Sequence, residues 1–139
     1  GYMPGSPKSH RPITSRLSEI FGSAVLCVDY RLMPEHSRMA GIEDCRMAYS
    51  WIFDHGPEGA APAESVVVAG DSSGGNLALS TIAWARDSGL RAADAVVVLS
   101  PQTDFTLASP SLKRNIDTDV TQGKSFGRRC GHRRYFLSG

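Results

Sequence analysis

The 139-residue sequence predicts an α/β fold, in which a mostly parallel sheet is flanked by helices. Short apolar runs alternate along the chain with segments of helical periodicity, as they do in such folds. The apolar runs lack strict polar alternation, which is typical of parallel strands that are buried on both faces. The composition agrees, since 41% of the residues are hydrophobic and 21% are charged, as in an ordinary globular protein.

The first helix is predicted over residues 12–21. Pro12 suits the first turn of a helix and Gly22 suits its end. Between them, apolar side chains recur at steps of three and four, which places them on one face. These side chains are Ile13, Leu17, Ile20 and Phe21.

Two further helices and three strands complete the predicted alternation. The strands are expected at the apolar runs 24–29, 65–69 and 95–99. The helices are expected over residues 41–55 and 76–86, each followed by a glycine-containing segment that ends it. A polar loop is predicted between residues 30 and 38. Trp51 and Trp84 lie on helical faces, and we expect both to pack in the core rather than to contact a substrate.

The periodic pattern ends after Pro101. Residues 102–121 are mostly polar with scattered apolar positions, and residues 122–139 show no sustained period. We therefore assign residues 1–121 to one α/β domain. We expect residues 122–139 to be a basic, poorly ordered tail, because their apolar surface is too small to offset the entropy of ordering them.

The net charge of +1 is unevenly distributed along the chain. Residues 1–112 hold 8 basic and 12 acidic side chains, whereas residues 113–139 hold 7 basic and 2 acidic ones. A basic segment can bind nucleic acid. This one lacks regularly interleaved aromatic side chains, so we expect no nucleic-acid partner.

The cysteines and the apolar runs indicate the compartment. Cys27, Cys45 and Cys130 are odd in number and form no C-x-x-C pair, which favours a reducing environment. No apolar run approaches the roughly 18 residues that a membrane span needs. The first residues lack the charged start and apolar core of a signal peptide, so we expect a cytoplasmic chain. Position 1 is not methionine, so it need not be the natural start of the protein.

One motif in the sequence indicates a catalytic function. Residues 70–74, Gly-Asp-Ser-Ser-Gly, match G-x-S-x-G and lie between an apolar run and a helix, where a nucleophile elbow occurs. Such a turn exposes the Ser72 hydroxyl at the carboxyl end of the sheet, where open α/β sheets bind ligands. It also aims the backbone N–H of Ser73 at a developing oxyanion. We expect Gly70 and Gly74 to leave room that side chains would fill.

Two other interpretations of the motif stay open. A turn rich in glycine and serine can simply join a strand to a helix. A phosphate-binding turn is the other alternative, although neither G-x-G-x-x-G nor G-x-x-x-x-G-K-[ST] is present.

Several longer segments of the sequence resemble the motifs of a known family and occur in the same order along the chain. They are Val28-Asp-Tyr-Arg-Leu-Met-Pro-Glu-His36, Gly41-Ile-Glu-Asp44 leading to Trp51, Gly70-Asp-Ser-Ser-Gly-Gly-Asn-Leu-Ala78 and Leu99-Ser-Pro-Gln-Thr-Asp104. Together they resemble the hormone-sensitive-lipase-like branch of the α/β-hydrolase carboxylesterases over about residues 1–119. The resemblance implies a serine esterase or lipase that forms an acyl-enzyme on Ser72. It implies a small-molecule ester substrate and neither a metal nor an organic cofactor.

The sequence departs from this family at both ends. Members carry an HGGG motif that supplies oxyanion donors, and Gly1-Tyr2 resembles only its last glycine and the next residue. Three predicted strands are the middle of the family's larger sheet, so we interpret the chain as the central part of the fold and expect weak or absent turnover. A non-catalytic remnant or binding domain and a serine hydrolase of peptides or thioesters remain alternatives.

The acid and base of a catalytic triad have no convincing candidates. The family's chain order of serine, acid and histidine leaves His132 as the base, and the arginines around it disfavour an imidazolium. Those arginines are Arg128, Arg129, Arg133 and Arg134. The acids between Ser72 and His132 are Asp104, Asp117 and Asp119, and we expect Asp104 to be structural. We also expect structural roles for Asp71, Asp29, Arg31 and Glu35.

Overall fold

The computed structural model describes residues 2–106 and 108–120. The chain divides into two compact units, Gly1–Pro101 and Gln102–Gly139. The predicted domain boundary at residue 121 lies at the edge of the described part and stays a prediction. The predicted tail, residues 122–139, lies outside the described residues.

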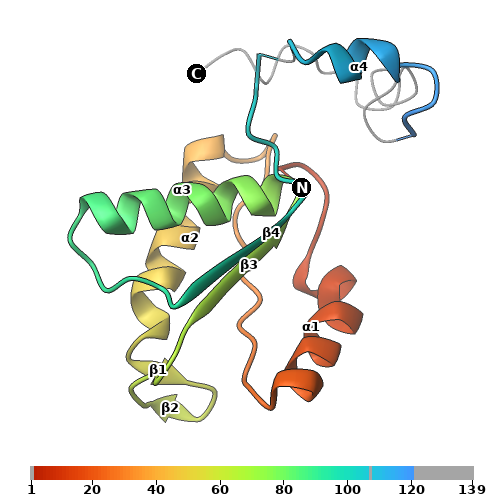
Figure 1. Cartoon of the computed structure of the whole chain (residues 1–139). Helices are drawn as coiled ribbons and strands as arrows, with labels where there is room; N and C mark the ends of the chain where they lie inside the picture. Colours follow the sequence, from red (N-terminus) through yellow and green to blue (C-terminus); the bar gives the residue numbers. More distant parts are fainter. Residues whose placement is uncertain (1, 107, 121–139) are drawn as a thin grey trace. The chain divides into compact units, whose positions relative to one another are not determined.

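The first unit is a parallel strand pair with helices packed beside it. Its helices are α1 (Pro7–Phe21), α2 (Arg38–Ile52) and α3 (Ser73–Asp87). Its strands are β1 (His55–Gly56), β2 (Gly59–Ala60), β3 (Val67–Asp71) and β4 (Ala95–Leu99). β3 pairs with β4 in parallel, and α3 makes the crossover between them (Figure 1). The predicted α/β architecture is therefore confirmed.

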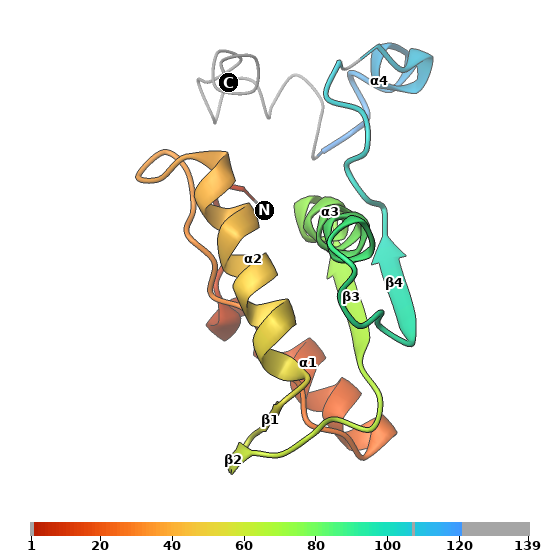
Figure 2. The same cartoon turned by 90° about the vertical axis from the view of Figure 1, so that its left-hand side faces the viewer.

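The core of the first unit lies between α2, α3 and the start of β3. Tyr49, Phe53, Val66 and Ala85 are its buried members. The rings of Tyr49 and Phe53 meet edge to face, with their centroids 5.1 Å apart. Figure 2 shows α3 end-on, between α2 and the two strands. This packing fixes the helix that follows the motif.

Trp84 contributes to this core, and Trp51 does not. Trp84 is partly buried against the core cluster and lies under the guanidinium of Arg46, 5.2 Å from the ring centroid. Trp51 is 46% exposed and stacks on His55. The prediction of a core role is confirmed for Trp84 and wrong for Trp51, because Trp51 lies on the outer face of α2.

The sheet is covered on one face in the described part of the chain. Exposed and half-buried residues alternate along both strands, and Val68 packs on the core while Val67 and Leu99 are 57% and 63% exposed. The prediction of strands buried on both faces is therefore wrong here. The physical reason is that α3 packs on one face, whereas the backbone of α1 lies too far from both strands to cover the other face.

The predicted strand at residues 24–29 does not form. The segment has no strand hydrogen bonding, and Val25 and Leu26 are more than 40% exposed. A strand needs a neighbour whose N–H and C=O groups complete the ladder. β3 and β4 pair with each other, and no described strand pairs with residues 24–29.

Helices α1 and α2 start earlier than predicted, and a serine cap marks each start. α1 begins at Pro7, since Ser6 and Ser9 form reciprocal side-chain to backbone hydrogen bonds, and Pro12 lies inside the helix. α2 begins after Ser37, whose hydroxyl accepts from the N–H of Ala40.

Smaller differences concern the strands and turns. The predicted strand 65–69 lies two residues later, as β3, whereas the prediction of 95–99 is confirmed as β4. The predicted helix 41–55 ends at Ile52, and β1 and β2 form a small antiparallel hairpin after it. α3 begins three residues before the predicted 76.

The second unit contains one short described helix, α4 (Pro110–Arg114). The sequence did not predict it, because five residues are too few to show a period. Within the described ranges, no helix of either unit combines the length and the apolar character needed to cross a bilayer.

Candidate active site

Ser72 occupies a sharp turn between β3 and α3. Its backbone has φ 53° and ψ −117°, a combination that residues other than glycine rarely adopt. The Ser72 N–H donates to the carbonyl of Leu99, at 2.9 Å, and the Ser72 carbonyl accepts from the N–H of Asn76, at 3.2 Å. The turn is therefore held on one side by β4 and on the other by the first turn of α3. This is the backbone geometry that the motif predicts.

Close packing explains one glycine of the motif, Gly70, and the glycine that follows the motif, Gly75, which is not the pair we expected. A Cβ on Gly70 would collide with the backbone of Gly74 and lie 2.8 Å from the Gly75 nitrogen. A Cβ on Gly75 would lie 2.9 Å from the Cβ of Pro101. A Cβ on Gly74 would meet nothing within 4 Å beyond its own helical turn. The expectation is confirmed for Gly70 and wrong for Gly74, because the crowding occurs one residue later, against Pro101.

The Ser72 hydroxyl is free of protein hydrogen bonds in the described part of the chain. It caps no N–H group of α3, although Ser72 stands at the N-cap position. Neither an imidazole nor a carboxylate of the described residues 2–101, in the unit that contains Ser72, is hydrogen-bonded to it. Ser73, the first residue of α3, is buried, and its N–H lies at the positive end of the helix. A serine hydroxyl without a described partner and a backbone N–H at a helix N-terminus therefore occupy adjacent positions.

Asp71 contacts His10, which precedes Ser72 in the chain and therefore does not fit the family's order of serine, acid and histidine. His10, in the first half of α1, has its Nε2 atom 3.4 Å from Oδ1 of Asp71. The two side chains are 37% and 59% exposed, so the contact contributes at most about 1 kcal/mol of stability. Because the imidazole meets Asp71 and not Ser72, this arrangement fits the structural role expected for Asp71.

The loop after residue 29 is clamped onto α2 by Arg31. Its guanidinium donates to both carboxylate oxygens of Asp44, the shortest distance being 2.8 Å, and its backbone N–H donates to the same carboxylate at 2.8 Å. These bonds lower the pKa of Asp44. A Cβ on Gly41 would lie 2.9 Å from the Arg31 carbonyl oxygen, so the loop lies directly against the helix. The structural role expected for Arg31 is confirmed.

Tyr2 connects this loop to the serine turn. Its carbonyl accepts the N–H of Met33 at 2.9 Å, and its hydroxyl donates to Oδ1 of Asn76 at 2.5 Å. Tyr2 is 6% exposed, and burial raises the pKa of its phenol. Sequence reasoning noticed Tyr2 as the residue after a family glycine but missed its contact with Asn76, because no local pattern links two positions 74 apart.

The candidate acids all lie in the second unit, apart from the unit that contains Ser72. Asp104 lies in the second unit and accepts hydrogen bonds from the N–H and hydroxyl of Thr106, at 2.8 and 2.6 Å. These bonds lower its pKa and support the structural role expected for it. Asp117 and Asp119 belong to the same unit. His132 lies outside the described residues.

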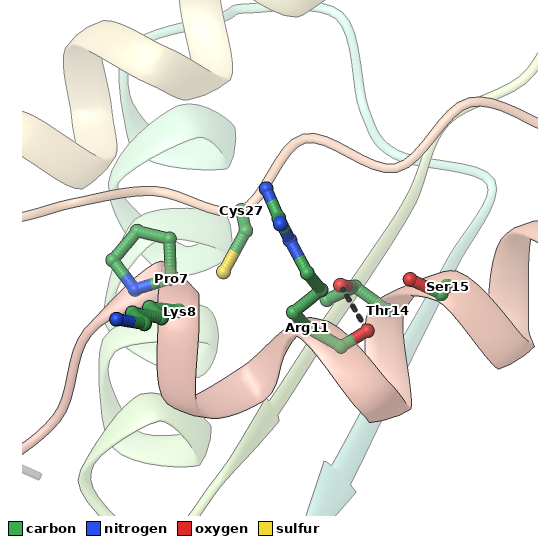
Figure 3. Close-up of a pocket in the computed structure, with 6 residues that line it drawn as sticks. All are labelled: Pro7, Lys8, Arg11, Thr14, Ser15 and Cys27. Carbon is green, nitrogen blue, oxygen red and sulfur yellow. Dashed lines mark hydrogen bonds between the residues drawn. The ribbon is translucent and has the colours of Figure 1, made fainter.

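The other potential sites in the described residues offer fewer reactive groups than the turn at Ser72. Within the described ranges, no three His, Cys, Asp or Glu side chains gather closely enough to hold a metal ion. A pocket of about 410 Å³ is lined by α1 and by Cys27, whose side chain points toward the helix (Figure 3). Burial, and then the nearby Asp29, raise the pKa of the Cys27 thiol, so it stays protonated near neutral pH. The pocket contains no residue of the serine turn.

The sequence is similar to a known protein family and to several characterised proteins. A family model described as the α/β-hydrolase fold matches residues 1–130. An acetyl-hydrolase of Streptomyces hygroscopicus is 37% identical over 110 residues, which cover 79% of this chain and 36% of that protein. Hormone-sensitive lipase of Bos taurus is 33% identical over 112 residues, covering 80% of this chain and 15% of the lipase. The chain thus spans little more than a third, or less, of the length of these curated relatives.

Solved structures of esterases are also similar to this chain over most of its length. An esterase/lipase from an uncultured bacterium is 37% identical with a TM-score of 0.72, over 82% of this chain and 38% of that one. The hormone-sensitive-lipase homologue EstE7 from a metagenome library is 32% identical with a TM-score of 0.78, over 91% of this chain and 43% of EstE7.

Proposed function

The chain belongs to the α/β-hydrolase fold family, and we propose that it carries the nucleophile of a serine hydrolase acting on carboxylic esters of short to medium acyl chain. The observation that carries this proposal is the backbone of Ser72, which keeps a strained positive φ between β3 and α3 while its hydroxyl is used by no other described group. Strained residues of this kind cluster at active sites. The relatives named acetyl-hydrolase and hormone-sensitive lipase support ester substrates.

The proposed chemistry is acyl transfer through Ser72. The Ser72 oxygen attacks the ester carbonyl carbon, the bond from that carbon to the alkoxy oxygen breaks, and the alcohol leaves with the proton from the serine. Water then attacks the acyl-enzyme, which releases the carboxylic acid and restores the hydroxyl. The backbone N–H of Ser73 stabilises the oxyanion in both steps. No metal or organic cofactor takes part.

Proton transfer limits the proposed activity of this chain. A serine hydroxyl needs an adjacent base to become a strong nucleophile. Since no described imidazole is bonded to Ser72, we expect weak turnover by the 139-residue chain and covalent labelling of Ser72 as the more sensitive readout.

The cellular context is part of the proposal. Cys27 and Cys45 are free thiols, which supports a reducing compartment, and we propose the cytoplasm. The proposed partner is a small-molecule ester, and no nucleic acid is involved.

Hydrolysis of p-nitrophenyl butyrate by the purified chain tests the proposal. The same ester was soaked into crystals of the related EstE5. We expect slow release of p-nitrophenol by the unmodified chain and none above background by Ser72→Ala. Ser80→Ala is the matched control, because it removes a hydroxyl from the same helix about two turns further on.

The outcomes separate the alternatives. Equal activity of Ser72→Ala and the unmodified chain would contradict a nucleophilic role for Ser72. No activity and no acylation in a folded sample would favour the non-catalytic alternative. Faster cleavage of a thioester or a peptide anilide than of the butyrate ester would move the substrate class away from esters.

A further inference from the structure

Tyr2 and Asn76 form a partly buried link between the start of the chain and the serine turn. The Tyr2 side chain is almost fully enclosed, and its hydroxyl donates to Oδ1 of Asn76 at 2.5 Å. The backbone N–H of Asn76 donates in turn to the carbonyl of Ser72 at 3.2 Å. The phenol is therefore bonded to the same helical turn that closes on Ser72.

The other side of Tyr2 is anchored as well. Its carbonyl accepts the N–H of Met33, which is buried, in the loop that Arg31 clamps to Asp44 of α2. An anchored donor loses little conformational entropy when its hydrogen bond forms. Tyr2 thus transmits the position of the loop and of α2 to the first turn of α3.

We propose that Tyr2 and Asn76 are positioning residues that hold the Ser72 turn in its strained conformation. A residue with a positive φ keeps that conformation only when its surroundings over-determine it. The bond from Ser72 to Leu99 holds the strand side of the turn, and the tight packing of Gly75 on Pro101 holds the helix backbone. The Tyr2 bond is a side-chain contact that ties the helix side of the turn to the rest of the first unit.

The consequence for catalysis rests on the proposed function. A nucleophile must be held within a fraction of an ångström of its productive position, and small misplacements lower the rate strongly. Loss of the Tyr2 hydroxyl is therefore expected to slow reactions at Ser72 without removing any group that touches a substrate.

Tyr49 supplies a matched control for a merely structural role. It is 5% exposed, and its hydroxyl also makes a long-range bond, to the carbonyl of Arg91 at 2.7 Å. That bond lies in the core between α2 and the segment before β4, and it involves no residue of the serine turn. Tyr2→Phe and Tyr49→Phe each delete one partly buried, bonded hydroxyl, so only their effects on the turn should differ.

Amide hydrogen exchange of the folded chain provides the deciding measurement. We expect Tyr2→Phe and Asn76→Ala to speed exchange at Ser72 about threefold to tenfold relative to Val97 in the middle of β4, the usual range for one hydrogen bond. The double variant should show no further change, because both substitutions break the same bond. Tyr49→Phe should leave this ratio unchanged. An unchanged ratio in Tyr2→Phe, or an equal change in Tyr49→Phe, would overturn the proposal.

Fluorophosphonate labelling then tests the link to reactivity. The labelling rate of Ser72 is expected to fall about threefold to tenfold in Tyr2→Phe and to stay constant in Tyr49→Phe, compared at equal folded fraction. A loosened turn with an unchanged labelling rate would contradict the catalytic consequence. Absence of labelling in the unmodified chain would count against the proposed function, and the exchange ratios would still decide the role of Tyr2.

Discussion

Replacing Ser72 by glycine is expected to stabilise the chain, even though it removes the proposed nucleophile. A residue in a sparsely populated backbone region costs about 1–3 kcal/mol, and Ser72 has φ 53° and ψ −117°. Glycine reaches such angles without strain but adds about 0.5–1 kcal/mol of unfolded-state entropy. The hydroxyl has no described partner to lose. Ser72→Gly should therefore be about 1 kcal/mol more stable than Ser72→Ala, which keeps the strain.

Equilibrium urea unfolding measures this difference in the free energy of unfolding. The midpoint should rise in Ser72→Gly with an unchanged slope, since the surface exposed on unfolding stays the same. Ala83→Gly is the control, because Ala83 is exposed in the middle of the same helix, where glycine costs about 1 kcal/mol. If Ser72→Gly were as stable as Ser72→Ala, or less stable, the argument from backbone strain would fail.

Three further predictions concern other described groups. Gly75→Ala should destabilise the chain by about 1–3 kcal/mol in urea unfolding, whereas Gly74→Ala should stabilise it by about 0.5–1 kcal/mol, and equal effects would contradict the assignment of crowding. Arg31 lowers the pKa of Asp44, so the stability from this pair is present above the ordinary carboxyl pKa of about 4 and is lost as the pH falls below it. Unfolding curves from pH 6 down to pH 2 should show a smaller acid loss in Asp44→Asn, and an identical loss would refute this. Burial raises the pKa of Cys45 to about 11, so iodoacetamide at pH 8 should modify it far more slowly in the folded chain than in urea, and equal rates would count against its burial.

Local patterns in the sequence predicted the parts of the fold that local interactions determine. The apolar run at 95–99 forms β4 with the predicted bounds, and the glycine-serine motif produces the predicted turn at Ser72. In both cases the signal lies within a few consecutive residues. The start of α1 was displaced because Pro12 was interpreted as a first turn, while the Ser6 cap, six residues earlier, supplies the bonds that start the helix.

Features that depend on distant partners could not be predicted. Residues 24–29 have the composition of a strand, but pairing depends on a neighbouring strand, and the described chain provides none. Gly75 must be small because Pro101 lies against it, and Tyr2 meets Asn76 across 74 positions. The contact of His10 with Asp71 was missed for the same reason, since chain order carries no information on distance.

The most direct test of the account is the identification of the residue modified when the folded chain reacts with a fluorophosphonate. Peptide mapping by mass spectrometry should find the adduct on Ser72, with labelling abolished in Ser72→Ala and retained in Ser80→Ala. An adduct on another residue, or no adduct on a folded chain after prolonged incubation, would contradict the claim that this strained turn presents a nucleophile.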